Sequence, residues 1–109
     1  AGSHVFMSNG KNDETTSTRS MTALMTAGDV PTIGERGWDV DPIDLRGDRA
    51  LTDNPASANR TSVGGSDLTF VSYTNANTGH FTLYTDSRLR DMALQFWETA
   101  VEGVPEVEY

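Results

Sequence analysis

Apolar and polar positions follow a regular period only in the last third of the chain, from Leu68 to Gly103. Residues 68–74 and 80–85 are rich in β-branched and aromatic side chains, a composition typical of strands. A short connection that includes Gly79 separates them, and glycine suits the positive φ that such turns require. The pattern therefore predicts an antiparallel β-hairpin. Apolar side chains fall on both of its faces, so we expect a covering layer on each.

An amphipathic helix is predicted to follow the hairpin, from about Arg88 to Glu102. Asp86 or Ser87 suits the N-cap, where a side-chain oxygen accepts one of the free N–H groups of the first turn. Gly103 suits the residue that ends the helix. A hairpin packed by this C-terminal helix, after a long irregular N-terminal half, defines an α+β fold.

The apolar arc of this helix is wider than one hairpin face can cover. It spans about 200°, whereas a stripe of little more than half that width suffices to face one core. We therefore expect Leu94, Trp97 and Val101 either to pack under the irregular part of the chain or to contact another chain. The tail from Val104 to Tyr109 can add an extended segment to the edge of a partner's sheet.

The N-terminal residues 1–19 are predicted to form a flexible arm. Beyond Phe6 and Met7 they offer almost no apolar side chain whose burial could offset the loss of chain entropy. Residues 1–4 match the remnant that cleavage of an expression tag leaves, so His4 is given no role.

Residues 20–109 are predicted to form a single small domain. A short helix starts at Ser20 as N-cap and stops at Gly28, and at that length it is stable only when docked. Residues 29–66 are interrupted by glycine and proline, and no period persists there. Four apolar side chains are the expected anchors of this loop region: Trp38, Val40, Ile43 and Leu45.

The charge balance narrows the classes of partner. Sixteen acidic residues stand against eight basic ones, which gives a formal net charge of −8. Direct contact with nucleic-acid phosphates needs clustered basic side chains, so we expect none, and an anionic membrane surface is disfavoured for the same reason. Such acidity is typical of highly soluble proteins and of proteins from salt-adapted cells. It is also compatible with a protein that captures a basic partner or imitates DNA. Cysteine is absent, so the sequence does not indicate a compartment.

The tripeptide Arg46-Gly47-Asp48 is the one motif with a known receptor class, because integrins recognise this guanidinium and carboxylate on either side of a glycine. We include it as a candidate partner-binding site. The alternative is ordinary loop chemistry, in which a glycine turn carries charged flanks.

The acidic run that begins at Asp39 resembles a calcium loop only superficially. Ile43 stands where the third oxygen ligand of an EF-hand belongs, and Ala50 replaces the bidentate glutamate. No metal or cofactor is therefore predicted. A looser Ca²⁺ or Mg²⁺ site remains an alternative, built from Asp39, Asp41, Asp44 and Asp48.

His80 is the candidate for acid–base catalysis, because it is the only imidazole beyond residue 4. Asp86 and Ser87 could complete a catalytic group if the chain folds back. The alternative is a solvent-exposed histidine at the edge of a strand. The chain has neither a G-x-S-x-G elbow nor a phosphate-binding loop.

The sequence thus favours a non-catalytic module for protein–protein interaction or assembly, either a homo-oligomer or a subunit of a larger particle or surface structure. Its expected contact is the apolar strip Leu94, Trp97 and Val101. Two alternatives stay open: an acidic capture module or inhibitor that binds a basic partner, and a small hydrolase-like enzyme that uses His80.

Overall fold

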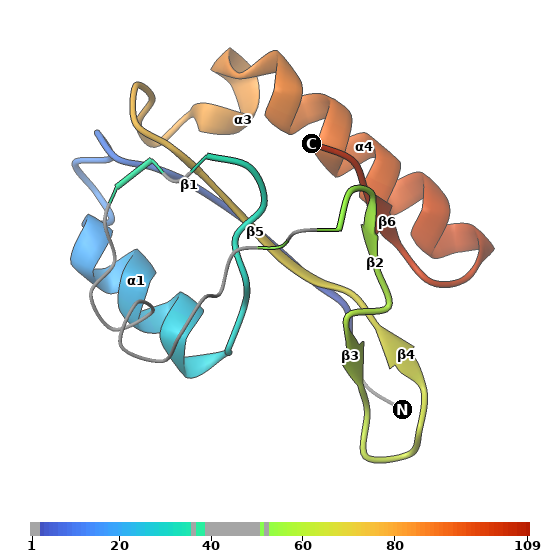
Figure 1. The fold of residues 1–109 in the computed structure, drawn as a ribbon. Helices are drawn as coiled ribbons and strands as arrows, with labels where there is room; N and C mark the ends of the chain where they lie inside the picture. Colours follow the sequence, from blue (N-terminus) through green and yellow to red (C-terminus); the bar gives the residue numbers. More distant parts are fainter. Residues whose placement is uncertain (1–2, 36, 39–50, 52) are drawn as a thin grey trace.

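A computed structural model describes residues 3–35, 37–38, 51 and 53–109 (Figure 1). Over these residues the chain is a mixed α and β fold with two-stranded sheets. Its helices are α1 (Thr18–Ala27), α3 (Thr82–Thr85) and α4 (Ser87–Glu102). Its strands are β1 (Val5–Gly10), β2 (Ala56–Ser57), β3 (Arg60–Thr61), β4 (Asp67–Leu68), β5 (Phe70–Asn75) and β6 (Glu106–Val107).

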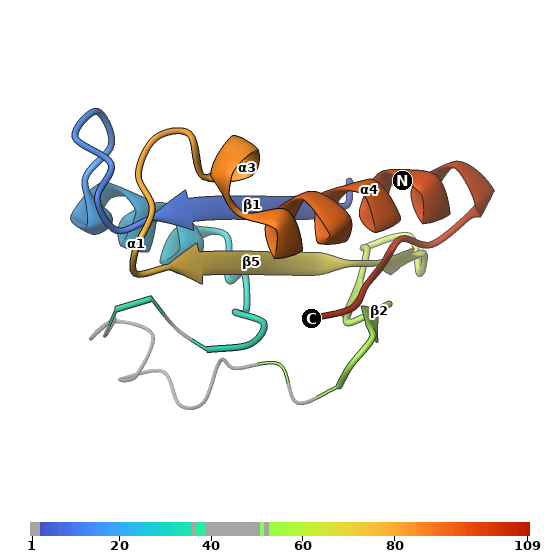
Figure 2. The ribbon, with the colours of Figure 1, turned by 90° about the horizontal axis from the view of Figure 1, so that it is seen from above.

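Strand β5 is the centre of the fold, because backbone hydrogen bonds reach both of its edges. On one edge it pairs in parallel with β1, in a register that runs from Val5 opposite Phe70 to Gly10 opposite Asn75 (Figure 2). On the other edge the amide of Ser72 donates to the carbonyl of Pro31, and the amide of Ile33 donates to that of Ser72.

Helices cover the two faces of this pair, with α4 on one face and α1 on the other (Figure 1). Successive side chains of β1 point to opposite faces, so Phe6 packs on the ring of Phe96 in α4 while Met7 packs against Met25 in α1. The larger core lies under α4 and contains the buried side chains of Ile33, Ala56, Val71, Tyr73, Leu89, Met92, Phe96 and Val107.

The strand β1 was not predicted from the sequence, which assigned residues 5–10 to a flexible arm. The strand forms because Phe6 and Met7 each enter a separate core, and because its backbone groups pair with β5. His4 has a structural contact as well: its Nδ1 accepts the amide of Thr69 at 3.1 Å. The tag origin of residues 1–4 stays a prediction, as does the domain boundary at residue 20.

The prediction that residues 80–85 form the second strand of a hairpin with β5 is wrong. Residues 80–85 are not a strand, because Thr82–Thr85 form one helical turn, α3. The amide of Tyr84 donates to the carbonyl of Phe81, and that of Asp86 donates to Thr82. With both edges of β5 already occupied, the β-rich composition of this segment has no neighbouring strand to pair with.

Both predicted helices are present. In α4, Asp86 is the N-cap, since its Oδ1 accepts the amide of Leu89 at 3.2 Å, and Gly103 ends the helix as expected. In α1 the N-cap is Ser17 rather than Ser20, and its hydroxyl accepts the amide of Ser20. The sequence offered several hydroxyl side chains in this stretch, and the helix begins at an earlier one.

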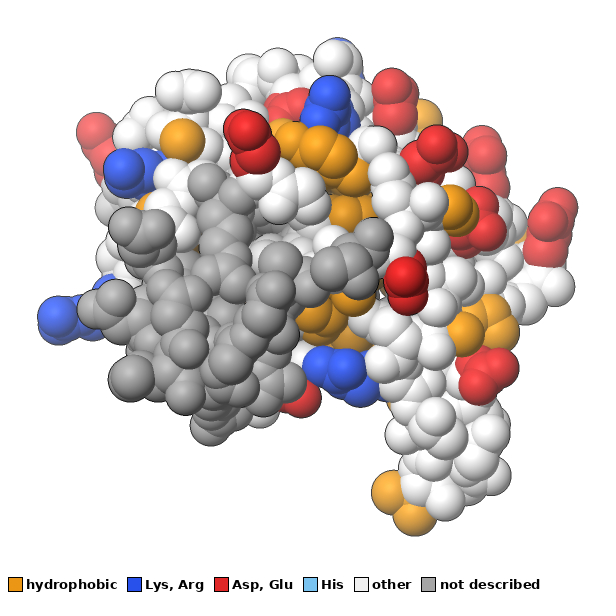
Figure 3. All heavy atoms as spheres, viewed as in Figure 1, with side chains coloured by type: hydrophobic (Ala, Val, Ile, Leu, Met, Phe, Trp, Pro, Cys, Tyr) orange, Lys and Arg blue, Asp and Glu red, His pale blue; other side chains and the backbone are white. Residues whose placement is uncertain are grey.

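The C-terminal segment folds back along α4 instead of extending freely. Strand β6 pairs antiparallel with β2, and Val107 is fully buried beside α4. The tail that the sequence suggested for a partner's sheet is therefore paired within its own chain. The β3–β4 hairpin projects from the body (Figures 1 and 3).

Candidate interaction surface on helix α4

The predicted apolar strip lies on the outer side of α4. Leu94 is 52% exposed, Trp97 is 57% exposed and Val101 is 89% exposed. The opposite side of the helix carries Leu89 and Met92, which are buried against the sheet. The described part of the irregular segment therefore does not bury the strip.

Two aromatic side chains of the preceding turn enlarge this surface. Phe81 is 65% exposed and Tyr84 is 72% exposed, and their rings contact one another at a centroid distance of 6.2 Å. Sequence reasoning missed both because it placed them in a strand. We call the set Phe81, Tyr84, Leu94, Trp97 and Val101 the α4 patch.

A pocket of about 230 Å³ lies between α3 and α4 and joins the two parts of the patch. Four of its lining residues come from α4, at positions i, i+3, i+4 and i+7. Four residues at this spacing form the kind of hole into which a side chain of a packed helix inserts. The lining residues are Leu83, Tyr84, Arg90, Ala93, Leu94 and Trp97.

The charges beside the patch are unevenly placed along the helix. Arg90 lines the pocket near the start of α4, while Glu98 and Glu102 are exposed towards its end. The two glutamates are like charges one turn apart near the negative end of the helix dipole, an arrangement that costs the isolated helix a few tenths of a kcal/mol. Acidic side chains are also prominent over α4 and the C-terminal segment in Figure 3. A cationic group brought to this end of the helix would relieve that repulsion.

A hydrogen-bonded cluster fixes the start of α4 against the end of β5. Asp86 Oδ2 accepts hydrogen bonds from the Tyr73 hydroxyl at 2.5 Å and from Asn75 Nδ2 at 2.6 Å. Burial, assisted by the bond to the Asp86 carboxylate, raises the pKa of Tyr73 to about 12. Burial also opposes ionisation of Asp86, but hydrogen bonds from Tyr73, Asn75 and the backbone outweigh it and lower the pKa of that carboxyl. The cluster thereby holds the helix that carries the patch.

His80 does not meet the partners that the enzyme alternative suggested. Its Nδ1 lies 3.1 Å from Oδ2 of Asp13, and its ring packs edge-on against Phe81. Asp86 is instead bonded to Tyr73 and caps α4. The pKa of Asp13 is lowered mainly by the backbone amide of Thr16. The pair therefore joins the loop after β1 to the loop after β5.

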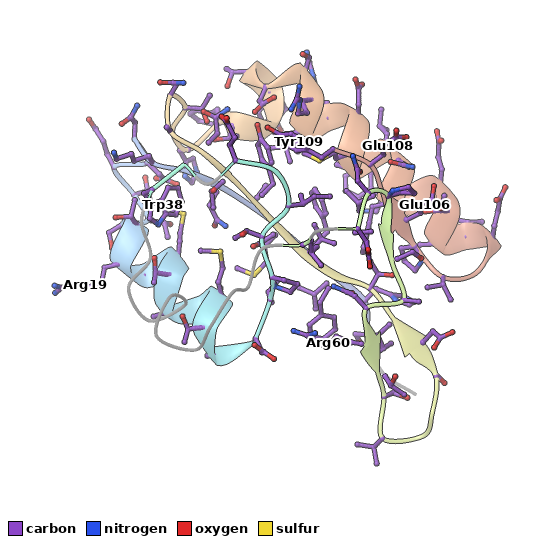
Figure 4. The ribbon with its side chains drawn as sticks, in the orientation of Figure 1. Arg19, Trp38, Arg60, Glu106, Glu108 and Tyr109 are labelled. Carbon is purple, nitrogen blue, oxygen red and sulfur yellow. The ribbon has the colours of Figure 1, made fainter. Side chains whose placement is uncertain are left out.

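Other sequence-based candidates lie outside the described residues. They are the Arg46-Gly47-Asp48 motif, the looser metal-site candidates Asp39, Asp41, Asp44 and Asp48, and the loop anchors Val40, Ile43 and Leu45. The fourth anchor, Trp38, is half-buried against Met25, and its Nε1 donates to Thr22 Oγ1 above α1 (Figure 4). In the described part of the chain, no three His, Asp or Glu side chains are grouped so that they could hold a metal ion.

Comparisons with protein-family models, with curated proteins and with solved structures give no match to this chain. Among the described helices, none has the length and apolar character needed to cross a membrane.

Proposed function

We propose that this chain is a non-catalytic association module whose α4 patch binds a protein surface with an apolar centre. The observation that carries the proposal is the exposure of Trp97 at the rim of an apolar pocket. Tryptophan is enriched among the residues that dominate binding energy in protein interfaces, especially where a pocket beside it is filled by the partner.

The energetics favour burial of the patch. Removing an apolar side chain such as Leu94 or Val101 from water contributes about 1.5–3 kcal/mol when burial is complete. The aromatic pair Phe81 and Tyr84 adds a large area that loses little conformational entropy on binding. Three of the five side chains, Tyr84, Leu94 and Trp97, line one pocket, and Phe81 contacts Tyr84. Burial of this exposed apolar surface is a driving force for association.

The shape of the pocket favours a helical partner. Its α4 lining has the spacing of a helix–helix hole, and Leu83 and Tyr84 close one side of it. A side chain from a packed helix would fill this volume, whereas a flat surface would leave it empty. The polar and charged groups around the patch give the rim that protein interfaces usually have.

Site-specific cross-linking tests the proposal. Leu94 is replaced by a photo-cross-linking amino acid in cells that express the chain. After irradiation, the masses of the covalent adducts are measured. We expect one discrete protein adduct. We also expect a second change, Trp97→Ala, to weaken binding of this partner by about 30-fold, the loss typical of a residue that dominates an interface.

The matched control places the same cross-linker at Leu24, an exposed apolar residue of α1 that is not part of the α4 patch. Adducts that form equally from both positions, or that Trp97→Ala leaves unchanged, would contradict the proposal. Circular dichroism of each variant confirms that α4 is intact, so that a loss of adduct is not a loss of fold.

A further inference from the structure

We infer that the partner of the α4 patch also adds an extended segment to the outer edge of β1, where this segment continues the sheet as a further strand. The inference rests on the proposed function and goes beyond it, because it names a second contact and the backbone chemistry that makes it. Two features carry it: the unpaired backbone groups of β1 and the position of Trp97 on the same side of the molecule.

Strand β1 is hydrogen-bonded to β5 along one edge only. The amide of Val5 donates to the carbonyl of Thr69 at 2.9 Å, and the amide of Lys11 donates to that of Asn75 at 2.8 Å. In a parallel pair such bonds recur at every second residue of a strand, so the odd-numbered residues of β1 face β5. The N–H and C=O groups of its even-numbered residues therefore point to the outer edge.

Phe6 and Ser8 carry these outward groups in the middle of the strand. Within the described part of the chain, no hydrogen bond reaches the backbone N–H or C=O of either residue, and Ser8 is exposed. In Figure 2, β5 lies on one side of β1 and no other described strand lies along the opposite side. An extended backbone, which offers N–H and C=O groups at the same spacing, is the ligand that satisfies such an edge.

Strand β1 also lacks the features with which proteins usually protect an edge. From Val5 to Gly10 it contains neither a proline nor a charged side chain, and an edge strand without them is a template for pairing with another chain. Parallel strands are found mainly in wider sheets whose two faces are covered by helices. One more strand beside β1 would give the β1–β5 pair that arrangement.

Trp97 lies on the flank of α4 that faces this open edge. Two other side chains mark the opposite flank, because Gln95 Nε2 donates to Glu106 Oε1 at 3.1 Å and Thr99 Oγ1 accepts the amide of Glu106 at 2.8 Å. The C-terminal segment that they contact lies on the side of β5 away from β1 (Figure 2). Trp97 is two residues from each, which turns it roughly 160° away from them around the helix.

The position of Trp97 defines the side chains of the added segment. Successive residues of a strand point to opposite faces, so every second residue of the segment would lie on the α4 side of the sheet, next to Phe6. That side is apolar, since Phe6 packs on Phe96 and Trp97 is 57% exposed. The segment that fits is therefore extended and apolar at alternate positions. The helix that the pocket accepts would cover this strand as α4 covers β1.

The donor of the segment is a separate protein rather than a second copy of this chain. Each copy carries a formal net charge of −8, and a charge of this size keeps copies apart. Strand addition needs no complementary charge, because main-chain hydrogen bonds give the affinity and alternate side chains give the specificity.

Peptide display tests the strand contact. The probe is a library of ten-residue peptides that are apolar at every second position, screened against the full chain. Each backbone amide of a selected peptide is then N-methylated in turn. We expect methylation at alternate residues to weaken binding by about tenfold or more, because only every second N–H of an added strand faces β1. Methylation at the residues between them should change binding by less than about twofold. Losses at consecutive positions would contradict strand addition.

Two variants at Ser8 locate the contact on β1. Ser8→Pro removes the outward N–H and leaves the bonds to β5, and proline is tolerated on an edge strand in this orientation. Ser8→Ala is the matched control, because it removes only the hydroxyl. We expect Ser8→Pro to weaken peptide binding by about tenfold or more and Ser8→Ala to leave it within about twofold. Circular dichroism and thermal unfolding confirm that both variants are folded.

Amide exchange of the wild-type chain gives a measurement that needs no variant. In the free chain we expect the amides of Phe6 and Ser8 to exchange faster than those of Met7 and Asn9, which face β5. Binding of the selected peptide should then protect Phe6 and Ser8. If their exchange is unchanged while the peptide is bound, the edge of β1 is not the binding site.

The outcomes separate this inference from the proposed function. If Ser8→Pro leaves the binding of every selected peptide unchanged, the strand contact is overturned. If the Leu94 cross-linker then still yields one adduct that is sensitive to Trp97→Ala, the proposed function stands without this inference. If the strand contact is made, Ser8→Pro weakens that adduct as well. An adduct between two copies of this chain would overturn the assignment to a separate protein.

Discussion

The hydroxyl of Tyr73 donates a hydrogen bond of 2.5 Å to Oδ2 of Asp86, and this contact links the central strand to the first turn of α4. Asp86 uses its other oxygen to cap the helix at Leu89. One carboxylate therefore fixes both the position and the beginning of the helix that carries the α4 patch. Damage to this contact should loosen the surface without touching any of its side chains.

Replacing Tyr73 with phenylalanine removes the hydroxyl and keeps the ring. Hydrogen bonds to a charged group contribute about 1.5–3 kcal/mol, so we expect Tyr73→Phe to lower the free energy of unfolding in urea by that amount. Tyr84→Phe is the matched control, because Tyr84 is exposed and its hydroxyl is not part of this cluster. An equal effect of the two variants would show that the bond to Asp86 contributes nothing.

The lowered pKa of Asp86 predicts a loss of stability in acid. A carboxyl whose pKa is lower in the folded state than in the unfolded state stabilises the fold above its unfolded value, here near 3.8. This stability is lost as the pH falls below that value, because the folded carboxyl must then be protonated. Urea unfolding at a series of pH values from 6 down to 2 measures the loss. This range spans the pKa of a free aspartate, which is about 3.9.

The control for the acid effect is Asp86→Asn, which keeps a good N-cap side chain but does not titrate. We expect this variant to be less stable than the wild type near neutral pH and to lose less stability in acid. If the two curves stay parallel across the whole range, Asp86 is not the group responsible.

The raised pKa of Tyr73 predicts a loss of stability at high pH rather than in acid. Its pKa of about 12 lies above the ordinary value of 10.0, so its contribution is complete below pH 10 and is lost as the pH rises towards 12. Ultraviolet absorbance of the phenolate follows the titration directly. We expect a late component in the phenolate signal, and this component should vanish in Tyr73→Phe. A late component that persists in Tyr73→Phe would contradict this assignment.

The sequence predicted α4 and the apolar strip along it because both depend on local rules. The cap at Asp86, the stop at Gly103 and the helical period of Leu94, Trp97 and Val101 can be recognised without any tertiary contact. The pocket beside Trp97 could not be recognised in this way, because Leu83 and Tyr84 reach it only through the turn α3. Composition had placed that turn in a strand, which also hid the exposed aromatic pair.

The sequence could not predict β1 because the contacts that stabilise this strand are tertiary. A strand that sends Phe6 to one core and Met7 to another needs few apolar residues, and its buried Asn9 is accommodated by a contact with the sulfur of Met25. Its partner β5 lies some sixty residues away, at a separation that no local period spans. Parallel pairing over such distances depends on the helices that cover both faces.

The role of β1 can be tested at Phe6, whose ring lies 5.4 Å from that of Phe96. Truncation of large core side chains costs about 3–5 kcal/mol when they are fully buried, and Phe6 is half-buried, so we expect Phe6→Ala to cost about 2 kcal/mol. Val63→Ala, at the exposed tip of the β3–β4 hairpin, should change stability by less than about 0.5 kcal/mol. A flexible arm would make the two variants indistinguishable.

The loop after β1 contacts the loop after β5, and a substitution at Gly10 tests this contact. A Cβ atom added at Gly10 would lie 2.6 Å from the carbonyl oxygen of Thr78 and would also contact the hydroxyl of Thr82. Neither backbone nor buried hydroxyl can move aside easily, so we expect Gly10→Ala to cost about 1–3 kcal/mol. Gly65→Ala is the control: its φ of +86° is strained for alanine, but nothing lies within 4 Å of the added atom. The control should cost about 1 kcal/mol, from the strain of an L residue in the left-handed region alone. If thermal unfolding shows that Gly10→Ala is the milder change, the loops after β1 and β5 do not meet as described.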